Sequence, residues 1–191
     1  MKGMKIFVFG ASTRSGSYNR RLAENAAEIW KSAHPADEID LARFKEFDMP
    51  LYGGDLEESA GLPAGARALV ERVKAADAVL ISTPEYNRSI PGTLKNAVDW
   101  VSRSDAKPFA KKPVLLISAS PGPYGGFVGH WATRPPFETI GARVFPSTFS
   151  LAKAGDAFTP EDRLKDPKSV EILGKIVGEF RSFAAALAGK T

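Results

Sequence analysis

The feature that most constrains the fold is a short apolar run that ends in a hydroxyl-rich loop and continues as an amphipathic stretch. Residues 5–9 form the run, residues 10–18 form the loop, and apolar residues then recur at helical spacing: Leu22, Ala26, Ile29 and Ala33. A strand that leads into a helix in this way places free backbone amides and the positive end of the helix dipole together. The pattern predicts an anion site at the end of the first strand.

The side chains of this loop indicate which anion it binds. Four of them carry hydroxyl groups that can donate hydrogen bonds: Ser12, Thr13, Ser15 and Ser17. Arg14 adds a planar, charged group suited to phosphate oxygens. The loop does not match Gly-x-Gly-x-x-Gly and lacks a Gly-Lys-[Ser/Thr] segment, which favours a terminal monophosphate over a pyrophosphate or triphosphate. The alternative is an ordinary connection in which Asn19 caps the helix.

Length and composition predict one domain covering residues 1–191, large enough for a substantial core. The sequence contains no apolar run close to the roughly 20 residues that span a bilayer, and its start lacks a signal-peptide pattern. We therefore expect a cytoplasmic protein with no membrane association. The absence of cysteine excludes disulfides, thiolate metal sites and cysteine nucleophiles, and the spacing of the two histidines gives no metal site.

The charge balance adds one constraint on partners. The formal net charge is +4, yet lysine and arginine form no dense block. A mildly basic surface suits an anionic cofactor, and we expect no nucleic-acid partner.

Predicted strands and helices alternate along the chain. The predicted strands are residues 5–9, 39–41, 78–82, 113–118 and 143–150. The predicted helices are residues 19–33, 64–75, 92–102, a weaker segment after residue 126, and 167–188. This alternation predicts an α/β fold with a parallel sheet, whose ligands bind outside the carboxyl ends of the strands.

Two further loops follow predicted strands at that edge. Residues 83–92 combine two prolines with Tyr86, Asn87 and free amides, which suits the edge of a planar heterocycle, although a capped turn fits equally well. Residues 118–126 contain glycines that permit close approach of the backbone to a ligand, and hydroxyl groups that provide polar edges. A bland turn is again the alternative. Three such loops at one edge favour a binding site.

Two of these loops resemble the signatures of a known family. Residues 10–19 resemble the Gly-Ser-x-Arg-x-x-Ser-x-Asn phosphate loop of the NADPH-dependent FMN reductases. Residues 83–102, with Pro-Glu-Tyr-Asn, Ile-Pro-Gly, Leu-Lys-Asn-Ala and Asp-Trp, are similar to the second signature of that family. The resemblance implies a flavodoxin-like fold: a five-stranded parallel sheet of order 2-1-3-4-5 with helices on both faces.

The resemblance also implies a set of binding residues. The FMN phosphate would be held by Ser12, Arg14, Ser17, Tyr18 and Asn19. The isoalloxazine would be lined by Pro84, Glu85, Tyr86 and Asn87. The ring and ribityl side would be closed by Ser118, Ser120 and Gly125. No side chain is expected to be catalytic, because FMN carries the chemistry.

The implied activity is that of an FMN-dependent NAD(P)H oxidoreductase. Such an enzyme takes a hydride from NADPH or NADH and passes electrons, in a ping-pong sequence, to quinones, free flavins, azo compounds or chromate. Arg88 favours NADPH as the donor. The alternative is a non-enzymatic FMN-binding electron carrier or redox sensor, although flavodoxin carriers are acidic and have a Thr-Gly-x-Thr loop. Relatives also imply a homodimer or homotetramer.

Several positions leave their roles open or depart from the family. Val128 and Thr133 stand where relatives commonly have arginine and leucine. The pair Pro135-Pro136 predicts that the helix after residue 126 breaks or restarts. Trp100 and Val101 suit either a dimer interface or simple core packing, and His130 could contact a substrate.

Overall fold

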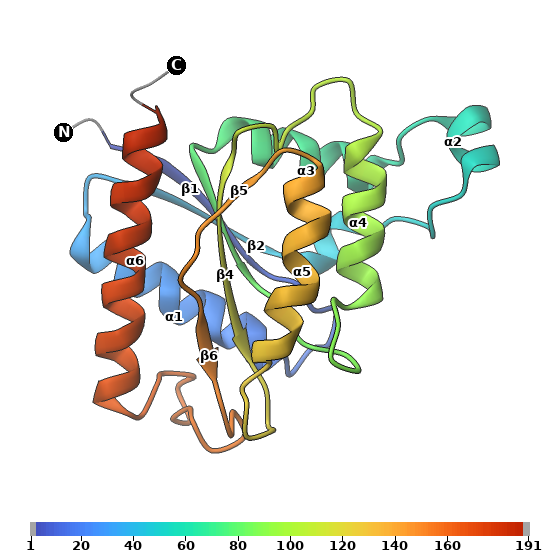
Figure 1. Ribbon diagram of the computed structural model, residues 1–191. Coiled ribbons are helices and arrows are strands. Elements are labelled where there is room, and N and C mark those ends of the chain that lie inside the picture. Colours follow the sequence, from blue (N-terminus) through green and yellow to red (C-terminus); the bar gives the residue numbers. More distant parts are fainter. Residues whose placement is uncertain (1–2, 189–191) are drawn as a thin grey trace.

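One parallel sheet organises the chain, and the computed structural model describes residues 3–188 of it (Figure 1). The strands run in the order β2-β1-β3-β4-β5, and β6 also pairs with β4. Their bounds are β1 Lys5–Gly10, β2 Glu38–Arg43, β3 Ala78–Ser82, β4 Pro113–Ala119, β5 Arg143–Val144 and β6 Phe149–Leu151. The predicted strand order is confirmed. Residues 1–2 and 189–191 of the predicted domain lie outside the described residues.

Helices cover both faces of the sheet, as predicted (Figure 1). Their bounds are α1 Tyr18–Ala33, 3-10 helix η1 Phe44–Phe47, α2 Gly54–Ala60, α3 Ala64–Ala75, α4 Gly92–Ser102, α5 Phe127–Thr139 and α6 Pro167–Ala188. No helix within residues 3–188 combines the length and apolar character needed to cross a membrane.

Side-chain alternation along β1 divides the core into two layers. Ile6 and Val8 point to one face and pack in a cluster with residues of α1 and α6. Phe7 and Phe9 point to the other face and pack in a cluster with residues of α3, α4 and α5. Because both faces are buried, β1, β3 and β4 read as continuous apolar runs in the sequence.

The predicted strand over residues 143–150 is wrong in one respect, since two short strands occupy it. Pro113 of β4 pairs with Arg143, an offset of 30 residues, whereas Ile117 pairs with Phe149, an offset of 32. Residues 145–148 therefore contain two more residues than the matching stretch of β4, and this segment leaves the sheet. Pro146 lies within it and cannot donate a ladder hydrogen bond.

The predicted break at Pro135-Pro136 is also wrong, because α5 continues through both prolines. Tertiary contacts hold the helix on either side of them. Phe137 is buried, and the centre of its ring lies 5.2 Å from the centre of the Phe109 ring. Arg134 donates hydrogen bonds to the carbonyl oxygens of Val144 and Phe145, at 3.2 and 3.0 Å. Packing thus outweighs the local effect of the two missing N–H donors.

The stretch between β2 and α3 was not assigned from the sequence and forms η1 and α2. None of the residues of α2 is buried, and this helix stands away from the rest of the chain (Figure 1). Trp100 and Val101 of α4 are buried within the chain itself. Trp100 Nε1 donates to the Pro50 carbonyl oxygen at 2.8 Å, and its ring packs edge-on against Tyr52 at 5.2 Å. Of the two readings of these residues, core packing is confirmed.

A buried ion pair ties the bend between α1 and β2 to the last helix, α6. Asp37 is 1% exposed and accepts hydrogen bonds from Arg181 Nε (2.7 Å), Trp30 Nε1 (3.0 Å) and the Met4 amide (2.9 Å). Burial raises the pKa of the Asp37 carboxyl, but these donors outweigh it and lower that pKa to about 2. The charged form of Asp37 is therefore part of the folded structure.

We predict that Asp37→Asn lowers the free energy of unfolding by about 3 kcal/mol at neutral pH, because it leaves the Arg181 guanidinium buried without a counter-charge. The folded pKa of Asp37 lies below the ordinary value of 3.8. This contribution is thus present above about pH 4 and disappears as the pH falls toward 2. Urea denaturation of parent and variant across this pH range measures the difference in unfolding free energy.

Glu38→Gln, which removes an exposed ion pair with Lys5, serves as the control and changes the free energy of unfolding by less than about 1 kcal/mol. A deficit that stays constant down to pH 2 would contradict the assignment.

Candidate functional site

Three loops meet at the carboxyl edge of the sheet: residues 11–17 after β1, 83–91 after β3 and 120–126 after β4. Backbone hydrogen bonds join them at their bases. The Ala11 amide donates to the Ser82 carbonyl oxygen at 2.8 Å, and the Thr83 amide donates to the Ile117 carbonyl oxygen at 2.8 Å. The predicted convergence of the loops is thus confirmed by the topology.

The first loop ends in a capped helix start. Ser17 is the N-cap of α1, with extended backbone, and its Oγ accepts a hydrogen bond from the Arg20 amide at 3.2 Å. The alternative that Asn19 caps the helix is therefore wrong. No acidic residue occupies the first turn of α1, so no negative charge of this turn opposes an anion there.

The side chains before the cap are accessible. Thr13, Arg14 and Ser15 are exposed and Ser12 is half-buried, with its Oγ accepting from the Arg14 amide at 3.3 Å. The Arg14 guanidinium lies 5.9 Å from the centre of the Tyr18 ring, close enough for a cation–π contact. The loop thus presents a positive charge, hydroxyl groups and the N-terminus of α1 at one place.

Asn19 contributes in a way that sequence reasoning missed. Its side chain is buried, and its Oδ1 accepts from the Ala119 amide at 2.9 Å and from Ser82 Oγ at 3.0 Å. Its Nδ2 donates to the Ala119 carbonyl oxygen at 2.9 Å. One amide group therefore fixes the start of α1 against the ends of both β3 and β4. An anion would meet Asn19 through its backbone N–H in the first turn of the helix.

The second loop is a tight turn. The Tyr86 amide donates to the Ser89 carbonyl oxygen at 3.1 Å, and the Ser89 amide donates back to Tyr86 at 3.0 Å. Asn87 and Arg88 have positive φ values of 51° and 60°, as a type I′ turn requires. Pro84 is buried, whereas the side chains of Tyr86, Asn87 and Arg88 are exposed. The turn thus exposes the side chains of Tyr86, Asn87 and Arg88 to solvent.

Glu85 joins the second loop to the third. Its Oε2 accepts a hydrogen bond from the Gly129 amide in the first turn of α5, at 2.7 Å. A Cβ at Gly129 would lie only 3.0 Å from Glu85 Cβ, so the contact depends on glycine. Glu85 and Gly129 stand 44 positions apart in the sequence, so no local pattern predicts this contact.

Ser118, at the end of β4, holds the third loop in place. This residue is fully buried, and its Oγ donates to the Gly125 carbonyl oxygen at 2.7 Å. Gly125 has a φ of 61°, and a Cβ there would lie 2.7 Å from the Leu151 carbonyl carbon. Its missing side chain therefore makes room for the neighbouring strand β6. Ser120 is half-buried, and its Oγ accepts from the Gly122 amide at 3.2 Å.

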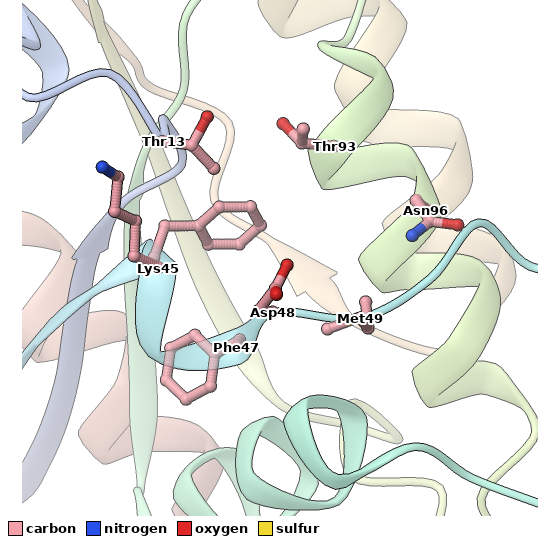
Figure 2. A pocket seen from close by; sticks show the side chains of 8 residues that line it. Thr13, Lys45, Phe47, Asp48, Met49, Thr93 and Asn96 are labelled. Carbon is pink, nitrogen blue, oxygen red and sulfur yellow. The ribbon is translucent and has the colours of Figure 1, made fainter.

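A cavity of about 460 Å³ borders the first loop on the side of α4 (Figure 2). It is lined by Thr13, Phe44, Lys45, Phe47, Asp48, Met49, Thr93 and Asn96. Five of these residues come from η1 and the two positions after it, a segment to which the sequence patterns assign no role. The two phenylalanines three positions apart, directly after a strand, are the signal that could have located it.

The fold and these loops define a flavodoxin-like α/β protein with a hydroxyl-rich loop between β1 and the N-terminus of α1. Residues 4–156 match the family profile described as NADPH-dependent FMN reductase. The chain therefore belongs to this family, and the resemblance noted in the sequence is confirmed.

Individual relatives agree with this assignment. The chain is 39% identical over 123 residues to a quinone reductase of Escherichia coli; the match covers 64% of this chain and spans only 63% of that relative's length. It is 32% identical over 187 residues to an NAD(P)H-dependent FMN reductase of Pseudomonas aeruginosa, covering 97% and 98% of the two chains. Among solved structures it resembles FerB, a flavoenzyme NAD(P)H:(acceptor) oxidoreductase from Paracoccus denitrificans, with a TM-score of 0.79, 26% identity and coverage of 96% and 98%.

We predict that Asn19→Ala lowers the free energy of unfolding by about 2–3 kcal/mol, because buried polar groups of Ala119 and Ser82 lose their partner. Chemical denaturation measures this loss. Ser15→Ala, at an exposed side chain of the same loop, is the control and stays within about 0.5 kcal/mol of the parent. Parent-like stability of Asn19→Ala would show that the side chain does not hold the loops together.

Proposed function

We propose that this chain is an FMN-dependent NAD(P)H oxidoreductase that passes electrons, in a ping-pong sequence, to small acceptors such as quinones, free flavins, azo compounds or chromate. The observation that carries the proposal is the first loop, where Arg14 and the hydroxyl groups stand before the Ser17-capped start of α1. Membership of the FMN reductase family and the names of the relatives support it.

The residues present fit the phosphate end of FMN. A dianionic monophosphate needs several donors and a positive field, and this loop offers hydroxyl groups, a guanidinium and helix amides without a nearby acidic residue in the first turn. The phosphate would be held by Ser12, Arg14, Ser17, Tyr18 and the backbone of Asn19. The pI near 9.3 agrees with an anionic cofactor.

The other two loops would receive the isoalloxazine. Backbone groups of Pro84 and Glu85, with the exposed side chains of Tyr86 and Asn87, would line its edge. The loop carrying Ser120 and Gly125 would close the ring and ribityl side, held in place by Ser118. Glu85 keeps the two loops in register through Gly129. These roles are proposals that rest on the placement of the loops at one edge.

When bound, FMN supplies hydride transfer and electron transfer to the acceptor. The chain's own part is to bind and orient the cofactor and to leave one side open to donor and acceptor. The exposed Arg88, a central residue of the turn proposed to bind the ring, would favour the additional phosphate of NADPH over NADH. The type I′ backbone of this turn presets its side chains, which reduces the ordering needed on binding.

The alternative proposal is a non-enzymatic FMN-binding electron carrier or redox sensor, and one experiment separates the two. The visible spectrum of the FMN-reconstituted protein is recorded before and after NADPH is added without oxygen. An oxidoreductase loses the absorbance of oxidised flavin promptly. Absorbance that persists with both NADPH and NADH would favour the carrier or sensor. A protein that retains no FMN at all would overturn both.

We predict that Arg14→Ala weakens FMN retention by about 10- to 100-fold while the fold stays intact, because a charge-assisted hydrogen bond contributes about 1.5–3 kcal/mol. Fluorescence titration of released flavin measures the dissociation constant. Arg143→Ala, which removes an exposed arginine from β5 at the opposite end of the sheet, is the matched control and leaves it unchanged. A variant that holds FMN as tightly as the parent would disprove the phosphate assignment.

We further propose that the whole chain, residues 1–191, forms a single FMN-binding domain that works in the cytoplasm, where NAD(P)H is available, as a homodimer or homotetramer. The protruding α2, with no buried residue of its own, and the 82% exposed side chain of Leu51 beside it support self-association. Sedimentation velocity on the purified chain tests the assembly, and a monomer would overturn it.

A further inference from the structure

The segment that joins β6 to α6, residues 152–166, packs against the helix that follows the first loop. Asn25 of α1 is buried and holds the backbone of this segment. Its Nδ2 donates to the Asp162 carbonyl oxygen at 2.7 Å, and its Oδ1 accepts from the Leu164 amide at 3.0 Å. A stretch near the end of the chain is therefore fixed beside the start of α1.

Arg21, in the first part of α1, is held by side chains of this segment. Its Nε forms an ion pair with Asp162 Oδ1 at 3.0 Å. Its guanidinium lies 5.9 Å from the centre of the buried Phe158 ring and 5.9 Å from the centre of the Tyr18 ring. These three contacts confine a side chain that would otherwise sample many rotamers.

Tyr18, the first residue of α1, has two cations close to its ring. The Arg14 guanidinium lies 5.9 Å from the ring centre, the same distance as the Arg21 guanidinium. The backbone of segment 152–166 lies near the hydroxyl end of the ring, since a Cβ at Gly155 would be 3.6 Å from the Tyr18 hydroxyl oxygen. The Tyr18 ring thus connects this segment to the guanidinium of the first loop.

The charges of the two arginines are balanced differently. Two guanidinium groups near one ring repel each other, and a counter-charge on one of them reduces this repulsion. Asp162 supplies the counter-charge for Arg21. Within residues 3–188 no carboxylate pairs with Arg14, so the charge of Arg14 stays available to an anion.

We propose that Arg21 and Asp162 are positioning residues for the phosphate of the bound cofactor. The pair holds the Tyr18 ring, and the ring holds the Arg14 guanidinium at the loop before binding, which reduces the ordering that binding requires. This role rests on the proposed function, since Arg14 and Tyr18 are proposed to hold the FMN phosphate. Asp162 lies outside residues 4–156 that match the family profile, so family membership does not imply its role.

The experiment compares FMN with riboflavin, which has the same ring but no phosphate, by fluorescence titration of the purified full-length chain. We expect Asp162→Asn to weaken FMN binding by roughly three- to tenfold, as the loss of one preordered side chain predicts, and to leave riboflavin binding unchanged. Asparagine tolerates the left-handed backbone of position 162, where φ is 62°, as aspartate does. Retained riboflavin binding shows that the variant is folded.

A purely electrostatic effect of Asp162 has the opposite sign. Removing a negative charge near an anion site tightens the binding of an anion, so tighter or unchanged FMN binding in Asp162→Asn would overturn the proposal. Glu161→Gln is the matched control, because it removes the same charge from the neighbouring exposed position. It leaves the preference for FMN over riboflavin as in the parent.

A second measurement does not depend on flavin. NMR relaxation of the arginine Nε–H groups in the FMN-free chain reports the mobility of Arg14 and Arg21. We expect both side chains to become more mobile in Asp162→Asn and to stay as in the parent in Glu161→Gln. Unchanged mobility of Arg14 would refute the positioning role even where FMN binds. A parent chain that retains neither FMN nor riboflavin would instead overturn the proposed function, together with the role that rests on it.

Discussion

The site depends on the hydrogen bonds of one buried amide group. Asn19 lies in the first turn of α1, and its side chain binds both the N–H and the carbonyl oxygen of Ala119 as well as the hydroxyl group of Ser82. The ends of β3 and β4 are thereby fixed relative to the helix whose N-terminus forms the proposed phosphate site. Without this contact, backbone hydrogen bonds would still join the bases of the loops, but no buried side chain would fix α1 to the ends of β3 and β4.

A second set of contacts fixes the loops relative to one another. Ser118 holds the backbone of Gly125, and Glu85 holds the first turn of α5 through Gly129. Residues that the family resemblance places around the ring are thus also the residues that position the loops against one another. The proposed binding roles coincide with these positioning roles because buried polar groups at the ends of strands require partners, and the neighbouring loop is the nearest source of them.

Much of the fold was predictable because it rests on local patterns. The strand order followed from alternating strands and helices together with the family signatures, and the apolar runs of β3 and β4 reflect burial on both faces. The errors have a common origin in contacts between distant residues. The course of α5 through Pro135 depends on Arg134 and Phe137 reaching partners elsewhere in the chain, and the role of Asn19 depends on residues about 100 positions away. No local propensity contains this information.

The interruption of the fifth strand shows how such an error can arise from the pairing register of the sheet. Two extra residues in segment 145–148 take Pro146 and Thr148 out of the sheet and open a space beside α5. His130 of α5 lines that space and is itself buried. Two residues thus decide whether β4 pairs with one continuous strand or with two short ones. The alternation of side chains does not report such an insertion, because both halves of the segment remain apolar and extended on their own.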